Sequence, residues 1–279
     1  MDFWKMNGAG NDFILLNDFS ASIPDAKLPE IARTLCERHL SIGADGLMVV
    51  RKPEQGGDYR MLFFNSDGSV GEMCGNGARC ICRYGYETGL SGDTQRVETT
   101  AGLVTGYRID AVNYRIRLNS PTVIDLHRCV TVDGNSYDCA YIELGSPGLP
   151  HAVVHIPGLR DADDAALFRL GRSLRYHSEF PKGANVNFYD LTGKDAIWLR
   201  TYERGVEDFT YACGTGTGST ALALCFLGLT GQQIMAEMRG GTLFAEVDTD
   251  ENETVRNLWL TGPTNIVAKG EITDQAFTL

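Results

Sequence analysis

Two short stretches decide the organisation of this chain, Cys74-Gly75-Asn76-Gly77 and Cys213-Gly214-Thr215-Gly216. They share the pattern C-G-x-G, and the second begins 139 residues after the first, which is half of the 279-residue length. Both continue to a Gly-Leu pair at the same spacing, at residues 89–90 and 228–229. An internal repeat of this length predicts two halves built to one plan.

The 139-residue register holds elsewhere in the sequence. Apolar residues follow the helical period over residues 28–39, and they do so again around residues 167–174. Short β-branched and aromatic runs, typical of strands, recur in this register at 46–50 and 185–189, and at 59–64 and 198–203. We therefore expect each half to contain strands, a surface helix, more strands, a helix led by cysteine, and closing strands.

The ends of the repeat mark the boundaries of the two halves. Ser120-Pro121-Thr122 corresponds to Gly262-Pro263-Thr264 at an offset of 142, and an insertion around residues 250–253 accounts for the change in offset. We expect the chain to cross between the halves at these two points. The predicted fold is α+β, with residues 1–119 and 263–279 in the N-terminal half and residues 120–262 in the C-terminal half.

Composition and charge limit the classes of partner. The chain is 43% hydrophobic and carries 25 Lys and Arg against 36 Asp and Glu, a net charge of −11, which argues against nucleic acid and anionic membranes. Its longest apolar run, residues 221–229, is shorter than the roughly 20 residues of a membrane span. The N-terminus resembles no signal peptide, so we expect a cytoplasmic protein with eight reduced cysteines. Their spacing suits no common structural zinc site, and no metal is expected.

A cysteine at a glycine-rich helix start suits acid–base chemistry. The helix dipole and the unsatisfied N–H groups lower the pKa of such a thiol below its usual value of about 8.5, and the same N–H groups bind carboxylate or phosphate. The alternative is a small buried hydrophobic residue beside glycines that allow close packing. Two copies related by a twofold axis would bring two thiols to one cleft. Racemisation of an amino acid needs such a pair, a base on one face of Cα and an acid on the other.

Five segments together carry a family resemblance. They are Met6-Asn7-Gly8-Ala9-Gly10-Asn11-Asp12-Phe13, Phe64-Asn65-Ser66-Asp67-Gly68-Ser69, Met73-Cys74-Gly75-Asn76-Gly77-Ala78-Arg79, Tyr202-Glu203-Arg204-Gly205 and Ala212-Cys213-Gly214-Thr215-Gly216. In order and spacing the chain resembles the diaminopimelate epimerase family, whose members are isomerases that work without pyridoxal phosphate. The resemblance implies two halves in which a mixed or antiparallel sheet curls around a central helix. It also implies an amino-acid substrate from lysine and peptidoglycan precursor biosynthesis and no cofactor, and it leaves a homodimer open.

The resemblance implies a role for each matched residue. Cys74 and Cys213 match the acid–base pair, while His151 and Glu203 match positions that tune the thiols and hold the reacting amino group. The backbone N–H groups that match the site of the α-carboxylate are those of Gly75, Asn76, Gly214 and Thr215. The side chains that match the substrate-binding positions, largely at the distal end of the substrate, are Asn11, Asn65, Asn185 and Arg204.

Taken without the resemblance, several of these residues have simpler interpretations. Asn11 and Asn65 lie in turn-rich stretches, Arg204 beside Glu203 can be a solvated pair, and His151 heads an apolar run. Three acidic residues in glycine-containing stretches, Asp12, Asp45 and Asp67, are interpreted as turn or cap residues, and the six remaining cysteines as packing residues.

Two departures from the family pattern affect the interpretation. Leu149 precedes Pro150-His151 where many members have an asparagine that contacts the distal group, and Gly46 stands where some members have glutamine. Leu149 therefore keeps open a racemase of the same chemistry for another amino acid. A third hypothesis is a ligand-binding or thiol-redox protein in which oxidation joins Cys74 to Cys213.

Overall fold

The computed structural model describes residues 1–71, 74–100, 102–252 and 254–273. Met73 of the matched segments, Glu253 of the predicted insertion and residues 274–279 of the predicted N-terminal half lie outside these ranges. The chain forms two compact units, Met1–Ile116 with Gly262–Leu279 and Arg117–Thr261. No helix in the described part of the chain is long and apolar enough to cross a membrane.

Unit 1 is a mixed sheet with two α-helices. Its strands are β1 (Asp2–Gly8), β2 (Asn11–Asn17), β3 (Gly46–Arg51), β4 (Tyr59–Asn65), β5 (Thr94–Thr99), β6 (Gly102–Arg108), β7 (Asn113–Leu118) and β17 (Asn265–Glu271). Its helices are η1 (Asp25–Lys27), α1 (Leu28–Cys36) and α2 (Gly75–Glu87). The strand order is β17-β1-β2-β3-β4-β5-β6-β7, and only the β2–β3 and β4–β5 pairs are parallel.

Unit 2 repeats this plan. Its strands are β8 (Pro121–Val132), β9 (Asn135–Leu144), β10 (Leu149–His155), β11 (Asn185–Gly193), β12 (Ala196–Glu203), β13 (Asp208–Phe209), β14 (Gln233–Met238), β15 (Gly241–Thr249) and β16 (Val255–Pro263). Its helices are η2 (Leu159–Asp161), α3 (Asp164–Arg175) and α4 (Gly214–Phe226). The order is β8-β9-β10-β11-β12-β14-β15-β16, with the short β13 also on β12, and the parallel pairs are β10–β11 and β12–β14.

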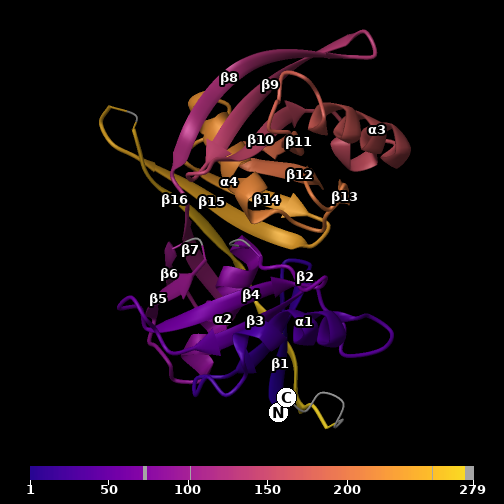
Figure 1. Cartoon of the computed structure of the whole chain (residues 1–279). Helices are drawn as coiled ribbons and strands as arrows, with labels where there is room; N and C mark the ends of the chain where they lie inside the picture. The colour runs from indigo at the N-terminus through magenta and orange to yellow at the C-terminus, as the bar shows by residue number, and fades with distance from the viewer. Residues whose placement is uncertain (72–73, 101, 253, 274–279) are drawn as a thin grey trace. The chain divides into compact units, whose positions relative to one another are not determined.

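The two units therefore share one sequence of parallel and antiparallel pairings, which confirms the predicted α+β fold with repeated halves. β17 occupies in unit 1 the place that β8 has in unit 2, so the last strand of the chain completes the sheet that the first strand begins. Figure 1 shows β17, in yellow, running beside the indigo β1. The hairpin from β15 to β16 has longer strands than its counterpart from β6 to β7, and the predicted insertion falls at its turn.

One helix in each unit is central and the other is peripheral. Helix α2 contacts β1, β2, β5 and β6, and α4 contacts strands from β8 to β15, so each sheet curls around its cysteine-led helix as predicted. The main contacts of helix α1 are with β3, β4 and η1. Its buried residues Leu28, Ala32 and Leu35 follow the helical period and form the face that packs against the unit. Helix α3 is capped by Asp163, whose carboxylate accepts a hydrogen bond from the Ala166 N–H at 2.7 Å.

The six cysteines outside the two repeat motifs differ in burial. Cys36, Cys80, Cys82 and Cys139 are buried, and burial raises the pKa of each thiol to about 12, so they behave as packing residues. Cys225 is half-buried. The packing interpretation is wrong for Cys129, which is exposed in β8 where alternate residues of the strand face solvent.

Candidate active site

Cys74 and Cys213 take the same place in their units, directly before the central helix. Both have extended backbone, with φ −101° and ψ 119° at Cys74 and φ −121° and ψ 113° at Cys213. The Cys74 carbonyl accepts the first helical hydrogen bond from Ala78 at 2.8 Å, and the Cys213 carbonyl accepts from Thr217 at 2.9 Å. The first-turn N–H groups that follow each cysteine therefore have no carbonyl acceptor within their helix, which is the arrangement that binds an anion.

In unit 1, a chain of amides leads away from the first turn of α2. The buried Asn76 donates through Nδ2 to Asn11 Oδ1 at 2.6 Å, and Asn11 donates through its own Nδ2 to Asp45 at 3.1 Å. Asp45 also accepts from the Asp12 backbone N–H at 3.1 Å. Asn11 therefore connects the helix start that bears Cys74 to the loop before β3.

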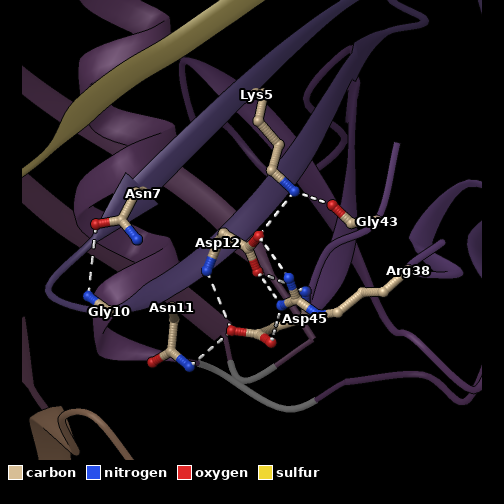
Figure 2. A network of polar contacts seen from close by, with 8 residues as sticks. All are labelled: Lys5, Asn7, Gly10, Asn11, Asp12, Arg38, Gly43 and Asp45. Carbon is tan, nitrogen blue, oxygen red and sulfur yellow. Dashed lines mark hydrogen bonds and ion pairs between the residues drawn. The ribbon is translucent and has the colours of Figure 1, made fainter. Parts of the chain in front are cut away.

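Charged residues hold that loop in place, as Figure 2 shows. Arg38 binds Asp12 at 2.6 Å and Asp45 at 2.8 Å, and Lys5 binds Asp12 at 2.8 Å and the Gly43 carbonyl. Burial raises the pKa of Asp12, but the hydrogen bonds from Lys5 and Arg38 outweigh it and hold the pKa below the usual 3.8. Asp12 and Asp45 are thus members of an ion-pair network. The turn or cap interpretation is wrong for Asp12, which lies within β2, whereas Asp45 lies in the bend before β3.

A buried arginine lies one turn into helix α2. Arg79 is fully buried, and it donates to Asn76 Oδ1 at 2.8 Å and to the Gly75 carbonyl at 3.3 Å. Burial lowers the pKa of Arg79 to about 10, which leaves it protonated at neutral pH. Within the described residues no carboxylate pairs with it, so it places a positive charge near the helix start. No pattern in the sequence predicted this role for Arg79.

Asn65 has a local role at the end of β4. Its N–H donates to the Ser69 carbonyl and its Nδ2 to Ser69 Oγ, both at 2.9 Å, so it closes a turn that Asp67 also supports through Ser69. Asn65 pairs with Gly46 across β3 and β4, and Phe13 pairs with Gly46 on the other side. Paired residues share a face of the sheet, so Asn65 lies on the face of Phe13, which packs near Gly77 of α2.

Strand register gathers the predicted residues of unit 2 on one face of the sheet. His151 pairs with Asn185, and Asn187, two residues later, pairs with Thr201. Residues i and i+2 of a strand share a face, so Glu203 at the end of β12 lies on this face too. It is the face toward α4, because a side chain at Gly216 would meet Asn187 Oδ1. Glu203 is half-buried, and its carbonyl accepts from Glu207 N–H at 2.8 Å.

Asn185 and Arg204 lie together at the edge of this face. Asn185 Oδ1 accepts the Arg204 backbone N–H at 2.9 Å, and Asn185 Nδ2 donates to the Pro150 carbonyl at 3.2 Å. The Arg204 guanidinium donates to the Lys182 carbonyl at 3.1 Å. Arg204 is therefore anchored and half-buried, rather than a freely solvated partner of Glu203.

His151 is fully buried in β10. Burial, together with the positive charge of Arg204, lowers the pKa of His151 to about 3, so the ring is neutral at physiological pH. Its Nδ1 lies 3.2 Å from Asn187 Nδ2. Its Nε2 has no hydrogen-bond partner within the described part of the chain.

The Cys213 thiol contacts its own helix start. Its Sγ accepts from Gly216 N–H at 3.4 Å and lies 3.6 Å from Thr215 Oγ1. Thr217 Oγ1 donates to the Cys213 carbonyl at 2.8 Å. A thiol that accepts a backbone N–H at a helix N-terminus is favoured in its anionic form.

A model of the diaminopimelate epimerase family matches residues 3–115 and 145–267. The chain belongs to the diaminopimelate epimerase family. This confirms the expected family and the expected enzyme class, an isomerase. A diaminopimelate epimerase of Aquifex aeolicus is 36% identical over 285 residues and covers 99% of each chain. A diaminopimelate epimerase of Archaeoglobus fulgidus is 39% identical over 260 residues, which cover 89% of this chain and 90% of the relative.

Solved structures share the fold at low sequence identity. A phenazine biosynthesis protein of the PhzF family from Bacillus anthracis superposes with a TM-score of 0.75 at 13% identity, over 98% of this chain and 99% of that one. A hydroxyproline epimerase from Agrobacterium vitis, solved with trans-4-hydroxy-L-proline, gives a TM-score of 0.70 at 16% identity, over 99% and 92%. At these identities the likeness establishes the diaminopimelate epimerase fold and nothing finer.

The two departures from the family pattern have different structural settings. Gly46 has no room for a side chain, because a Cβ would lie under 3.0 Å from the Phe63 ring and from the Phe64 carbonyl. Leu149 is half-buried at the start of β10 and pairs with Leu144. Across the residues that the structure describes, no cluster of His, Cys, Asp and Glu has the form of a metal site.

Proposed function

We propose that the protein interconverts LL- and meso-diaminopimelate, and that Cys74 and Cys213 act as the two bases. One observation carries this proposal. In each unit a cysteine precedes the central helix and a glycine-rich turn begins it, and both motifs lie within the residues that match the family, 3–115 and 145–267. The proposal includes a small-molecule substrate from lysine and peptidoglycan precursor synthesis, a cytoplasmic location and assembly as a homodimer.

The proposed reaction is a proton exchange at Cα. The thiolate of one cysteine removes the proton from one face, and the thiol of the other returns a proton to the opposite face, so that the two cysteines exchange protonation states in each turnover. The N–H groups of Gly75 and Asn76, and of Gly214 and Thr215, hold the α-carboxylate. They stabilise the negative charge that develops as the Cα–H bond breaks. No cofactor takes part.

The remaining predicted residues fit substrate binding in this proposal. Arg204 offers a guanidinium suited to a second carboxylate, and Asn185 fixes its backbone. Asn11 and Asn65 carry amides on the α2 side of unit 1, and Glu203 supplies a carboxylate for the reacting amino group. These assignments rest on the match to the family pattern.

Isotope exchange tests the proposal directly. LL-diaminopimelate incubated with the reduced protein in D₂O should gain deuterium at Cα and yield the meso isomer. Cys74→Ala and Cys213→Ala should each abolish interconversion, whereas Cys129→Ala, which changes an exposed cysteine of β8, should leave it intact. Full activity in either of the first two variants would exclude the two-thiol mechanism, and no exchange in the wild type would exclude the reaction.

The second candidate is a racemase of the same chemistry for another amino acid. Leu149 favours it, because an apolar side chain supplies no hydrogen bond to a polar distal group, and each lost partner costs about 1–3 kcal/mol. The D₂O experiment with a panel of amino acids separates the candidates. Preference for diaminopimelate removes the second candidate, and preference for an amino acid with an apolar side chain removes the first.

A further inference from the structure

We infer that Asn187 and Thr201 are positioning residues that fix His151 as the neutral tautomer with its proton on Nε2. They would thereby present a hydrogen-bond donor to the amino-acid substrate on the α4 face of unit 2. The inference deepens the proposed function, on which it rests.

The orientation of the Asn187 amide follows from its neighbours. Its Nδ2 lies 3.2 Å from the Ala152 carbonyl, which can only accept, so the atom on that side must be the donor nitrogen. Its Oδ1 lies 2.9 Å from Thr201 Oγ1, which donates to it. The amide therefore has one orientation that satisfies both contacts.

This orientation decides the tautomer of the histidine. The amide nitrogen has no lone pair to offer, so His151 Nδ1, at 3.2 Å, can face it only as an acceptor, although Nδ2 also lies 3.5 Å from the Asn185 carbonyl. A neutral ring with an accepting Nδ1 carries its proton on Nε2. That N–H is buried and unsatisfied within the described residues. A buried donor without a partner destabilises the structure, and an arriving acceptor atom of the substrate would remove this cost.

The repeat shows that the fold does not require polar residues here. Asn187 is the third residue of β11, and the third residue of β3 in unit 1 is Met48. His151 pairs with the first residue of β11, as Phe13 pairs with the first residue of β3. A side chain at Gly77 would meet Met48 and Phe13, whereas one at Gly216 would meet Asn187. Equivalent positions carry apolar side chains in unit 1 and polar side chains in unit 2. The hydrogen-bonded residues His151, Asn187 and Thr201 therefore do more than fill the core.

Nitrogen NMR of the ¹⁵N-labelled full-length protein tests the inference. The chain has five histidines, and the signals that vanish in His151→Phe belong to His151. In the wild type we expect a protonated Nε2 and an unprotonated Nδ1. In Asn187→Asp, the new carboxylate accepts from the ring, and we expect the proton on Nδ1. A wild-type ring protonated on Nδ1, or an Asn187→Asp ring unchanged from the wild type, would overturn the inference.

Kinetics give the second readout. Asn187→Met copies the residue of unit 1 and should fold, yet it leaves Nδ1 without a donor. We expect kcat to fall about tenfold in Asn187→Asp and in Asn187→Met, the equivalent of one hydrogen bond lost from the transition state. Asn135→Asp makes the same chemical change at an exposed position of β9 and should keep the wild-type kcat. Wild-type kcat in both Asn187 variants would refute the role.

The design separates this inference from the proposed function. If the wild type exchanges no proton of diaminopimelate, the proposed function fails, while the NMR signals of His151 still decide the tautomer. If exchange occurs and the tautomer is Nδ1–H, the proposed function stands and the inference fails.

Discussion

Gly77→Ala and Gly216→Ala make the same substitution at equivalent positions of the two repeats, and the structure predicts different outcomes for them. Each glycine is the third residue of its central helix. The added methyl would lie under 3.0 Å from Met48 Cε in unit 1 and from Asn187 Oδ1 in unit 2. The first neighbour is the free end of a flexible side chain, and the second is an amide held by several hydrogen bonds.

The two costs can be estimated from these neighbours. In a helix, Ala is more favourable than Gly by about 1 kcal/mol, and this gain applies to both variants. For Gly77→Ala, movement of the Met48 methyl costs about 1 kcal/mol, so the net change is close to zero. For Gly216→Ala, displacement of Asn187 breaks about two buried hydrogen bonds at about 1–2 kcal/mol each, in addition to overpacking of about 1 kcal/mol. The net loss is about 2–4 kcal/mol.

Urea unfolding followed by circular dichroism measures this difference. Gly216→Ala should unfold at a clearly lower urea concentration than the wild type, and Gly77→Ala close to it. Gly216→Ala should also lose turnover, because its methyl would lie 3.2 Å from the Cys213 sulfur. Equal losses of stability in the two variants would show that Asn187 moves as readily as Met48, and would remove the argument that the amide is held in place.

Three further predictions concern the groups around the two helix starts. Arg79→Met should lose about 1–3 kcal/mol in urea unfolding and raise KM, because Asn76 loses its donor, and Arg79→Lys should recover only part of both. Asp45→Ala should raise KM several-fold with little change in kcat, since Asn11 loses its acceptor; an unchanged KM would show that the network is structural only. Stability should rise with pH between about 3 and 6.5, by at most about 1.4 kcal/mol per pH unit from His151, because the unfolded ring binds a proton that the folded ring, with its pKa of about 3, does not. His151→Phe should reduce this slope, and an identical pH profile in the variant would contradict the assignment.

The repeat was predictable because it depends on spacing. A motif that recurs after 139 residues needs no knowledge of tertiary contacts, and both central helices begin at the residues that the motif indicates. Strand and helix positions followed from periodicity for the same reason. The roles of the polar side chains at the site could not be predicted from spacing, because each role depends on hydrogen-bond partners that are distant in the sequence. Asp45 meets Asn11 at a separation of 34 residues, and Asn187 meets His151 at 36.

One local signal could have identified Asn187. Residues 185–189 are Asn-Val-Asn-Phe-Tyr, and in a strand the two asparagines must share a face. If Asn185 faces the site, Asn187 therefore faces it as well. Arg79 carried no such signal, since an arginine five residues after the N-cap position is ordinarily solvated, and only the fold shows that it is fully buried.

The repeat also explains how one backbone plan provides two different chemical settings. Arg79 places a buried positive charge in α2, while the same repeat position in α4 is Gly218, where a side chain would meet Leu118 and Leu258. Conversely, the neutral polar pair of His151 and Asn187 has only apolar counterparts in unit 1. The buried charge of Arg79 favours the anionic form of a neighbouring group in unit 1, whereas the neutral ring of His151 adds no charge in unit 2. The proposed two-base reaction needs a thiolate and a thiol at the same time, and identical environments would favour neither assignment, so under this proposal the differences between the halves matter as much as their symmetry.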